Sequence, residues 1–126
     1  MEVSRLDHLV LTVKCIDMTV SFYTSVLGIK KTVFARGRVA LSFVNQKINL
    51  QEVGKVPEPA AANPIPGSAD LCFLTKTPLD AAMANVAACG VEIICGPVER
   101  NGANGPIRSF YFRDPDLNLI ELANEI

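Results

Sequence analysis

Three side chains in this sequence combine the donor types and the positions that a divalent cation would need. His8 is the only histidine, and it stands directly before an apolar run. Asp70 and Glu121 also stand beside apolar residues, Glu121 between Ile120 and Leu122. An ionised carboxylate buried without a partner is strongly destabilising, so we expect Glu121 to have a partner. One cation could bind all three side chains, with two carboxylates cancelling its charge and the imidazole staying neutral.

Each of the three residues also has a simpler structural interpretation. A lone histidine is often a structural residue rather than a ligand. Glu121 could pair with Arg108 or Arg113, or lie at an exposed edge near the end of the chain. Asp70 could cap the start of a strand after a turn.

An internal duplication favours the metal interpretation, because it relates these residues to one another. Two segments of the first half match two of the second at a constant offset of 62 residues, and the last strands match at an offset of 72. The matched pairs are 8–11 with 70–73, 27–29 with 89–91, and 48–50 with 120–122. Two copies related by a pseudo-twofold axis make His8 equivalent to Asp70, and Asn49 equivalent to Glu121.

The elements that must position these residues follow the order β-α-β-β-β in each half. Hydrophobic periodicity and turn residues mark their bounds, with Asp17 as an N-cap, Gly28 and Gly90 as helix ends, and Pro78 opening the second helix. The first half is predicted as a strand at 8–13, a helix at 17–27, and strands at 31–35, 39–44 and 47–53. The second half is predicted as a strand at 70–75, a helix at 79–89, a strand at 91–95, a glycine-rich loop at 96–106, and strands at 107–113 and 119–123.

Length and composition indicate one α+β domain built from two modules. The chain has 126 residues, of which 49% are hydrophobic, and its net charge is −1, which excludes intrinsic disorder. Residues 54–68 hold four prolines and two glycines, a composition typical of a linker. We therefore predict a first module at 1–53, a linker at 54–68 and a second module at 69–126.

The same composition argues against several classes of partner. The sequence has no run of Lys and Arg that would bind nucleic acid, and no apolar run near the ~20 residues that a spanning helix needs. Its first residues carry charges where a signal peptide needs an apolar core. The four cysteines show no metal-binding spacing, so we expect free, buried thiols and a cytoplasmic protein.

With these motifs in place, the chain resembles the vicinal oxygen chelate superfamily, which includes glyoxalase I, fosfomycin-resistance, extradiol dioxygenase and bleomycin-resistance proteins. The resemblance rests on the duplication, on the histidine of the first strand, on residues 112–121 (FRDPDLNLIE) and on the segment 22–28 (FYTSVLG). It covers essentially the whole chain. It implies two tandem βαβββ modules that form a cupped, barrel-like mixed sheet with the helices outside.

The resemblance also implies a ligand set. The family's metal ligands fall on His8, Asp70 and Glu121, while a position that is often Glu falls on Asn49. Gln51 stands where close relatives commonly have histidine. A single imidazole argues against iron-dependent ring cleavage, which uses two histidines. Oxygen-rich ligation favours Mn²⁺ or Mg²⁺, with Zn²⁺ or Ni²⁺ also open.

The function implied by the resemblance is that of a glyoxalase-like, metal-dependent lyase or isomerase acting on a small oxygenated substrate. Glu121 is the expected catalytic carboxylate, and the cation would stabilise negative charge on the substrate by Lewis acidity. The alternative is a metal-free protein that binds a small molecule without chemistry. A homodimer is expected, since members of this fold often pair. The residues expected to contact the substrate are Asn49, Gln51, Tyr111 and Arg113.

Overall fold

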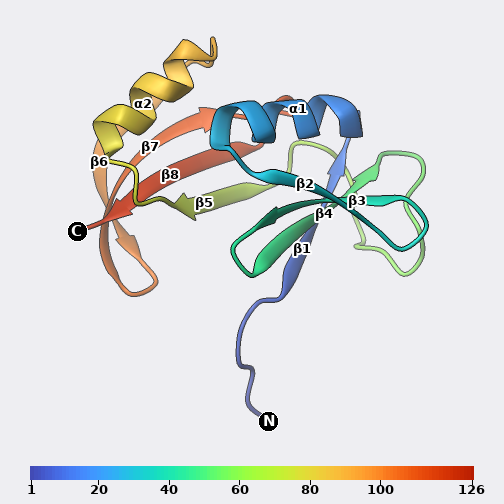
Figure 1. The fold of residues 1–126 in the computed structure, drawn as a ribbon. Coiled ribbons are helices and arrows are strands. Elements are labelled where there is room, and N and C mark those ends of the chain that lie inside the picture. The colour runs from blue at the N-terminus through green and yellow to red at the C-terminus, as the bar shows by residue number, and fades with distance from the viewer. The chain divides into compact units, whose positions relative to one another are not determined.

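The computed structural model describes all 126 residues, Met1–Ile126, and the chain divides into two compact units, Met1–Pro66 and Gly67–Ile126 (Figure 1). No helix is long and apolar enough to cross a membrane. Each unit contains one helix and one four-stranded mixed sheet. The predicted α+β class with two βαβββ modules is thereby confirmed.

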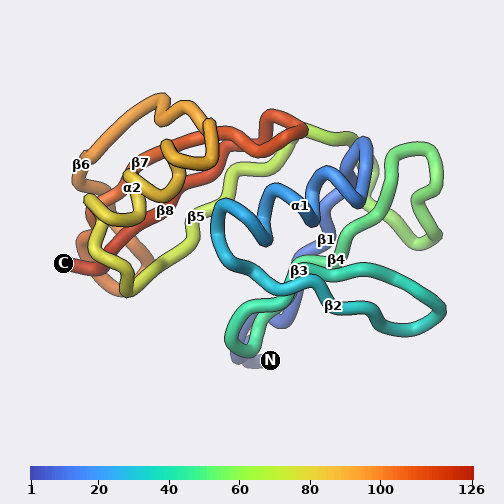
Figure 2. The backbone as a smooth tube through the Cα atoms, turned by 45° about the horizontal axis from the view of Figure 1, so that its top comes forward, coloured from blue at the N-terminus to red at the C-terminus, as the bar shows by residue number.

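The first unit has the strand order β1-β4-β3-β2. The edge strand β1 runs parallel to β4, and the remaining neighbours are antiparallel. The helix packs against β2, β3 and β4 of its own sheet, as the tube in Figure 2 also shows. The elements are β1 (His8–Val13), α1 (Ile16–Leu27), β2 (Lys30–Phe34), β3 (Arg38–Phe43) and β4 (Gln46–Glu52).

The second unit repeats this topology with the strand order β5-β8-β7-β6, and its helix packs against β7. Its core on the helix side includes Val86, Phe110, Phe112 and Ile120, each no more than 1% exposed. Because successive side chains of a strand point to opposite faces, the alternate residues lie on the face away from the helix, called here the open face. The elements are β5 (Asp70–Leu74), α2 (Leu79–Ala88), β6 (Cys95–Gly102), β7 (Gly105–Arg113) and β8 (Leu119–Glu125).

The hydrogen-bond register agrees with the duplication. In the first unit His8 pairs with Lys47 across the parallel strands, and in the second Asp70 pairs with Leu119. The two pairs are related by the same offsets, 62 and 72, that align the sequence. The equivalences of His8 with Asp70 and of Asn49 with Glu121 therefore hold residue by residue in the backbone.

The region 91–106 differs from the prediction of a strand followed by a loop. Instead, β6 and β7 form a long hairpin whose last pair, Gly102 with Gly105, leaves only Ala103 and Asn104 in the turn. The prolines and glycines do not prevent strand formation, because β6 is an edge strand and its register shifts between Cys95 and Val98.

Smaller differences concern the helix starts and the cysteines. Helix α1 begins at Ile16, so Asp17 lies in its first turn and is not the N-cap, and Pro78 lies just before α2. Gly28 does end α1, with a φ of 67°. All four cysteines are free as predicted, but the expectation of burial is wrong, because Cys15 is half-buried and the other three are exposed. Cys72 lies on the open face of the second sheet, Cys89 directly follows α2, and Cys95 is the first residue of the edge strand β6.

Candidate functional site

Four chemically active side chains share one level of the second sheet. Tyr111 pairs with Cys95 on one side and with Glu121 on the other, and Glu121 pairs in turn with Cys72. The open face of the sheet therefore carries a carboxylate with a phenol on one neighbouring strand and a thiol on the other. We call Cys72, Glu121 and Tyr111 the Glu121 row.

Glu121 is the electrostatic centre of this row. Its Oε1 atom is shielded from solvent and has no hydrogen-bond partner, which is unfavourable for a buried acceptor. Desolvation, the charge of Glu121 and a hydrogen bond to Glu121 raise the pKa of Cys72 to about 11, so its thiol is protonated at neutral pH. Desolvation is also the largest cause that raises the pKa of Tyr111. A hydrogen bond to Glu121 raises this pKa further, whereas one to Arg100 lowers it.

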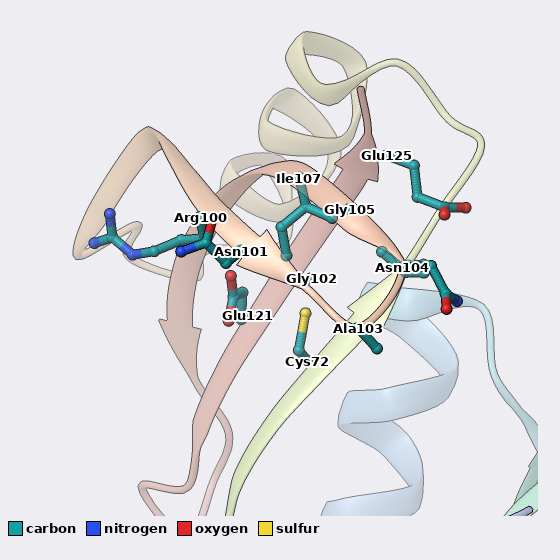
Figure 3. A pocket seen from close by; sticks show the side chains of 11 residues that line it. Cys72, Arg100, Asn101, Gly102, Ala103, Asn104, Gly105, Ile107, Glu121 and Glu125 are labelled. Carbon is teal, nitrogen blue, oxygen red and sulfur yellow. The ribbon is translucent and has the colours of Figure 1, made fainter.

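A cavity of about 520 Å³ opens beside Glu121 (Figure 3). Cys72 and Glu121 form part of its wall, and the hairpin residues Asn101 and Asn104 form another part. The remainder includes the apolar side chains of Leu74 and Ile107. This volume lies within the range of about 300–1,000 Å³ that is usual for small-molecule sites. The mixture of an apolar wall with a few convergent polar groups is also usual for such sites.

Arg100 reaches the cavity rim from β6 and is fixed by three contacts. Its Nε donates a hydrogen bond to Tyr111 Oη at 3.2 Å, and its Nη1 donates one to the Glu99 carbonyl at 3.0 Å. The guanidinium carbon also lies over the Tyr111 ring, 5.7 Å from its centroid. The sequence prediction missed Arg100 and Asn101 because it placed them in a loop. The Asn-Gly pairs at 101–102 and 104–105 were the hairpin signal that could have found them.

The predicted residues of the first unit lie on or beside the open face of its sheet. The His8 side chain is 42% exposed, and its Nδ1 is 2.9 Å from Asp7 Oδ2. Asn49 is 5% exposed, and its Oδ1 has no hydrogen-bond partner. Gln51 Nε2 donates a hydrogen bond of 2.8 Å to Thr12 Oγ1. His8 thus has a carboxylate on one ring nitrogen, which leaves the other nitrogen for a ligand.

The remaining predicted residues belong to the second unit. Asp70 is exposed at the start of β5, on the same sheet face as Cys72, and its charge contributes to the raised pKa of that thiol. Arg113 Nη1 donates a hydrogen bond of 3.2 Å to the Leu117 carbonyl. Neither Tyr111 nor Arg113 lines the cavity.

No three His, Cys, Asp or Glu side chains gather as a metal site within either unit. The predicted ligand set takes His8 from the first unit and Asp70 and Glu121 from the second. It remains a prediction.

Comparison with known proteins identifies the family. The sequence profile of the Glyoxalase/Bleomycin resistance protein/Dioxygenase superfamily matches residues 5–122. The chain belongs to this superfamily. The resemblance inferred from the sequence motifs is therefore confirmed.

Several proteins are similar to this one over all or nearly all of the chain. An integron cassette protein from the mobile metagenome of V. cholerae is 56% identical, with a TM-score of 0.98 over 100% of this chain and 98% of that one. The virulence protein STM3117 of Salmonella typhimurium is 49% identical over 100% of this chain and 88% of its own sequence, and its crystal structure gives a TM-score of 0.98. The glyoxalase domain-containing protein RDO1 of Mycosarcoma maydis is 48% identical over 98% of this chain and 70% of its own length.

More distant structures share the fold alone. The fosfomycin resistance protein FosX from Listeria monocytogenes, complexed with Mn(II) and a dihydroxypropylphosphonic acid, is 24% identical, with a TM-score of 0.66 over 97% of this chain and 90% of that one. The antibiotic-binding protein TnmS3 from Streptomyces is 22% identical, with a TM-score of 0.78 over 100% of this chain and 99% of that one.

Proposed function

We propose that this chain is a glyoxalase-like lyase or isomerase that acts on a small oxygenated substrate with the help of a divalent cation, and that Glu121 anchors the site. One observation carries the proposal. Glu121 is the carboxylate on the cavity wall whose Oε1 is shielded from solvent and has no hydrogen-bond partner. A buried acceptor of this kind is stabilised by a cation or by a proton donor on a bound molecule.

The donor set is chemically suited to a divalent cation. Two carboxylates, Asp70 and Glu121, would balance its charge, and the imidazole of His8 would be the third ligand. The contact of His8 Nδ1 with Asp7 Oδ2 is the outer-shell arrangement that fixes the tautomer of a ligating histidine. This set favours Mn²⁺ or Mg²⁺ over softer ions, while Zn²⁺ and Ni²⁺ accept the same donors. FosX, which shares the fold, was crystallised with Mn(II).

Each side chain has a distinct role in this proposal. A bound cation would supply Lewis acidity toward adjacent oxygens of the substrate. Glu121 would exchange a proton with the substrate, because its Oε1 has no hydrogen-bond donor of its own. Asn49 and Gln51 of the first unit, and Tyr111 and Arg113 of the second, are the proposed substrate contacts. The functional protein is proposed to be a homodimer.

Metal binding by two cavity variants tests the proposal. After treatment with a chelator, we expect wild-type protein to take up about one Mn²⁺ per site in a calorimetric titration. Glu121→Gln keeps the shape of the side chain but removes its charge, and should weaken Mn²⁺ binding at least 100-fold. Glu125→Gln is the matched control, because Glu125 also lines the cavity but is exposed at the end of β8. Equal Mn²⁺ binding by the Glu121→Gln variant and the wild type would refute the assignment.

One second candidate is a protein that binds a small molecule without metal, because the cavity wall is partly apolar and includes Leu74 and Ile107. TnmS3, which shares the fold, is an antibiotic-binding protein. The two candidates differ in a single measurement. A metal-free binder retains no Mn²⁺, and its affinity for a cavity ligand is unchanged by EDTA.

A further inference from the structure

We propose that the cavity beside Glu121 selects a molecule that carries a protonated amine, and that Glu125 binds the ammonium group. The apolar body of this molecule lies against Leu74 and Ile107, which also line the cavity. Such a molecule is a substrate class for the function proposed above, on which the inference rests.

Two carboxylates line the cavity at different places along one strand. Glu121 and Glu125 both belong to β8, and both contribute to the cavity wall. Because they are four residues apart, their side chains point to the same face, and their Cα atoms are about 13 Å apart at the usual rise of a strand. In Figure 3 the two side chains lie on either side of Ile107. One carboxylate is therefore available for the cation of the proposed function, and the other for a second group of the substrate.

The negative charge of these carboxylates is not balanced within the cavity. Arg100 is the only basic residue of the cavity wall. It donates hydrogen bonds to Tyr111 Oη and to the Glu99 carbonyl, and in Figure 3 its guanidinium points away from the other labelled side chains. None of the salt bridges in the chain involves Glu121 or Glu125. Both carboxylates are therefore free to interact with a positively charged ligand.

The unit that contains the cavity is also acidic as a whole. Residues 67–126 carry four basic and eight acidic side chains, a net charge of −4, whereas residues 1–66 carry eight basic and five acidic side chains, a net charge of +3. The net charge of −1 for the whole chain conceals this difference. A field of one sign attracts ligands of the opposite charge and repels those of the same charge. The second unit thus favours an ammonium group over a carboxylate or a phosphate.

The cavity wall between the two carboxylates is apolar. Leu74 pairs with Ala123, the middle residue between Glu121 and Glu125 on β8, and Ile107 pairs with Glu125. The Leu74 side chain is 56% exposed, which is unusual for a leucine inside a cavity wall of a protein without a ligand. Covering it with an apolar group removes it from water and stabilises the complex. The wall therefore fits a ligand with an apolar body and an ammonium end.

Three probes of the same carbon number test the charge preference: hexylamine, hexanol and hexanoate. Hexylamine is protonated at neutral pH, as a lysine side chain is. Binding to the full-length protein is measured by NMR titration in low-salt buffer with EDTA. We expect hexylamine to bind about threefold or more tightly than hexanol, as for an exposed ion pair, and hexanoate to bind more weakly than hexanol. Equal affinities for hexylamine and hexanol, or no detectable binding of hexylamine, would overturn the inference.

Two variants separate the ammonium contact from the apolar contact. Glu125→Gln removes the charge and nearly keeps the shape, so it should weaken hexylamine binding about threefold to fivefold and leave hexanol binding unchanged. Leu74→Asn should weaken the binding of both probes about fourfold, the equivalent of about one buried CH₂ group. Unchanged binding of both probes by Leu74→Asn would mean that they bind outside the cavity, which would overturn the inference.

Glu99→Gln is the matched control for Glu125→Gln. Glu99 is an exposed acid of the same unit, but it does not line the cavity. This variant should bind hexylamine and hexanol like the wild type. An equal loss of hexylamine binding in Glu99→Gln and Glu125→Gln would show that the net charge of the unit attracts the amine, and would contradict the role of Glu125.

The inference and the proposed function can fail separately. Glu125 is outside the predicted ligand set of His8, Asp70 and Glu121, so Glu125→Gln should bind Mn²⁺ like the wild type while it loses affinity for hexylamine. A wild-type protein that prefers hexylamine but binds no Mn²⁺ would refute the metal-dependent activity and support the amine site. A protein that binds Mn²⁺ without any preference for hexylamine would overturn the amine site alone.

Discussion

The two units share a backbone register but differ in chemistry at the level of the Glu121 row. Where the second unit has Cys72, Glu121 and Tyr111 side by side on three strands, the first has Val10, Asn49 and Ala40. Strand pairing depends on backbone hydrogen bonds and on the alternation of faces, so it tolerates any side chain on the open face. The duplication has therefore preserved the scaffold while the open face diverged.

The open face of the first unit carries cations where the second unit has the half-buried carboxylate of Glu121. Lys47 Nζ lies 3.6 Å and the Arg38 guanidinium carbon 5.0 Å from the centroid of the Phe34 ring. A hydrogen bond with His8 is the main cause that lowers the pKa of Asp7, and the charge of Lys47 contributes to the same shift. In the second unit Asp70 and Glu121 act together on Cys72. The two acidic residues of the predicted ligand set therefore belong to the second unit, and His8 belongs to the first.

The largest expected effect is a difference in stability loss between substitutions on the two edge strands, β2 and β6. Gly96 has a φ of 114°, and a Cβ there would lie 2.7 Å from Phe110 Cα. Gly96→Ala should destabilise the protein by about 3 kcal/mol, from backbone strain and overpacking. Val33 occupies the corresponding place on β2 and is 61% exposed, so Val33→Ala should cost less than about 0.5 kcal/mol in urea unfolding. Equal losses in the two variants would contradict this contrast.

The next largest effect concerns the reactivity of the Cys72 thiol, which has no counterpart at the equivalent residue Val10. The pKa of Cys72 is raised to about 11, so only a small fraction of its thiol is the reactive thiolate at pH 8. This fraction grows as the pH approaches the pKa. Glu121→Gln removes the charge that contributes to this shift, so the pKa should fall. Alkylation of Cys72 by iodoacetamide at pH 8 should then be about tenfold faster, as measured by peptide mass spectrometry. A rate that is unchanged in Glu121→Gln would show that Glu121 does not act on the thiol.

The sequence predicted much of this comparison, because the signals that define a module are local. Alternating apolar residues, Gly28 at a helix end and two constant offsets were sufficient to predict both modules and the equivalence of Asn49 with Glu121. The hairpin of β6 and β7 was missed, because Pro97 and its neighbouring glycines are typical of a loop. Only the three-dimensional pairing shows that Pro97 lies within a register shift of an edge strand.

The candidate site was predicted less completely, for a physical reason. Glu121 could be identified because a charge among buried apolar residues is unusual in any strand. Arg100 could not, because an arginine near a turn is ordinary and its contact with Tyr111 depends on the twist of the hairpin. Cys72 could not be identified either, because its neighbour on the sheet, Glu121, lies 49 residues farther along the chain.

The smallest effect tests whether the cation cluster of the first unit is structural. If Phe34 serves mainly to hold Lys47 and Arg38, then removing either cation should cost only the energy of an exposed cation–π contact, about 0.5–1 kcal/mol. Lys47→Gln should cost more than Arg38→Gln, because its ammonium lies closer to the ring, and both losses should vanish in a Phe34→Leu background. Urea unfolding of this double-mutant cycle measures the coupling. A coupling above about 2 kcal/mol would make the cluster part of the first unit's core. The open face of the first unit would then contribute to the free energy of unfolding through its cation–π contacts, in addition to differing from the second in charge.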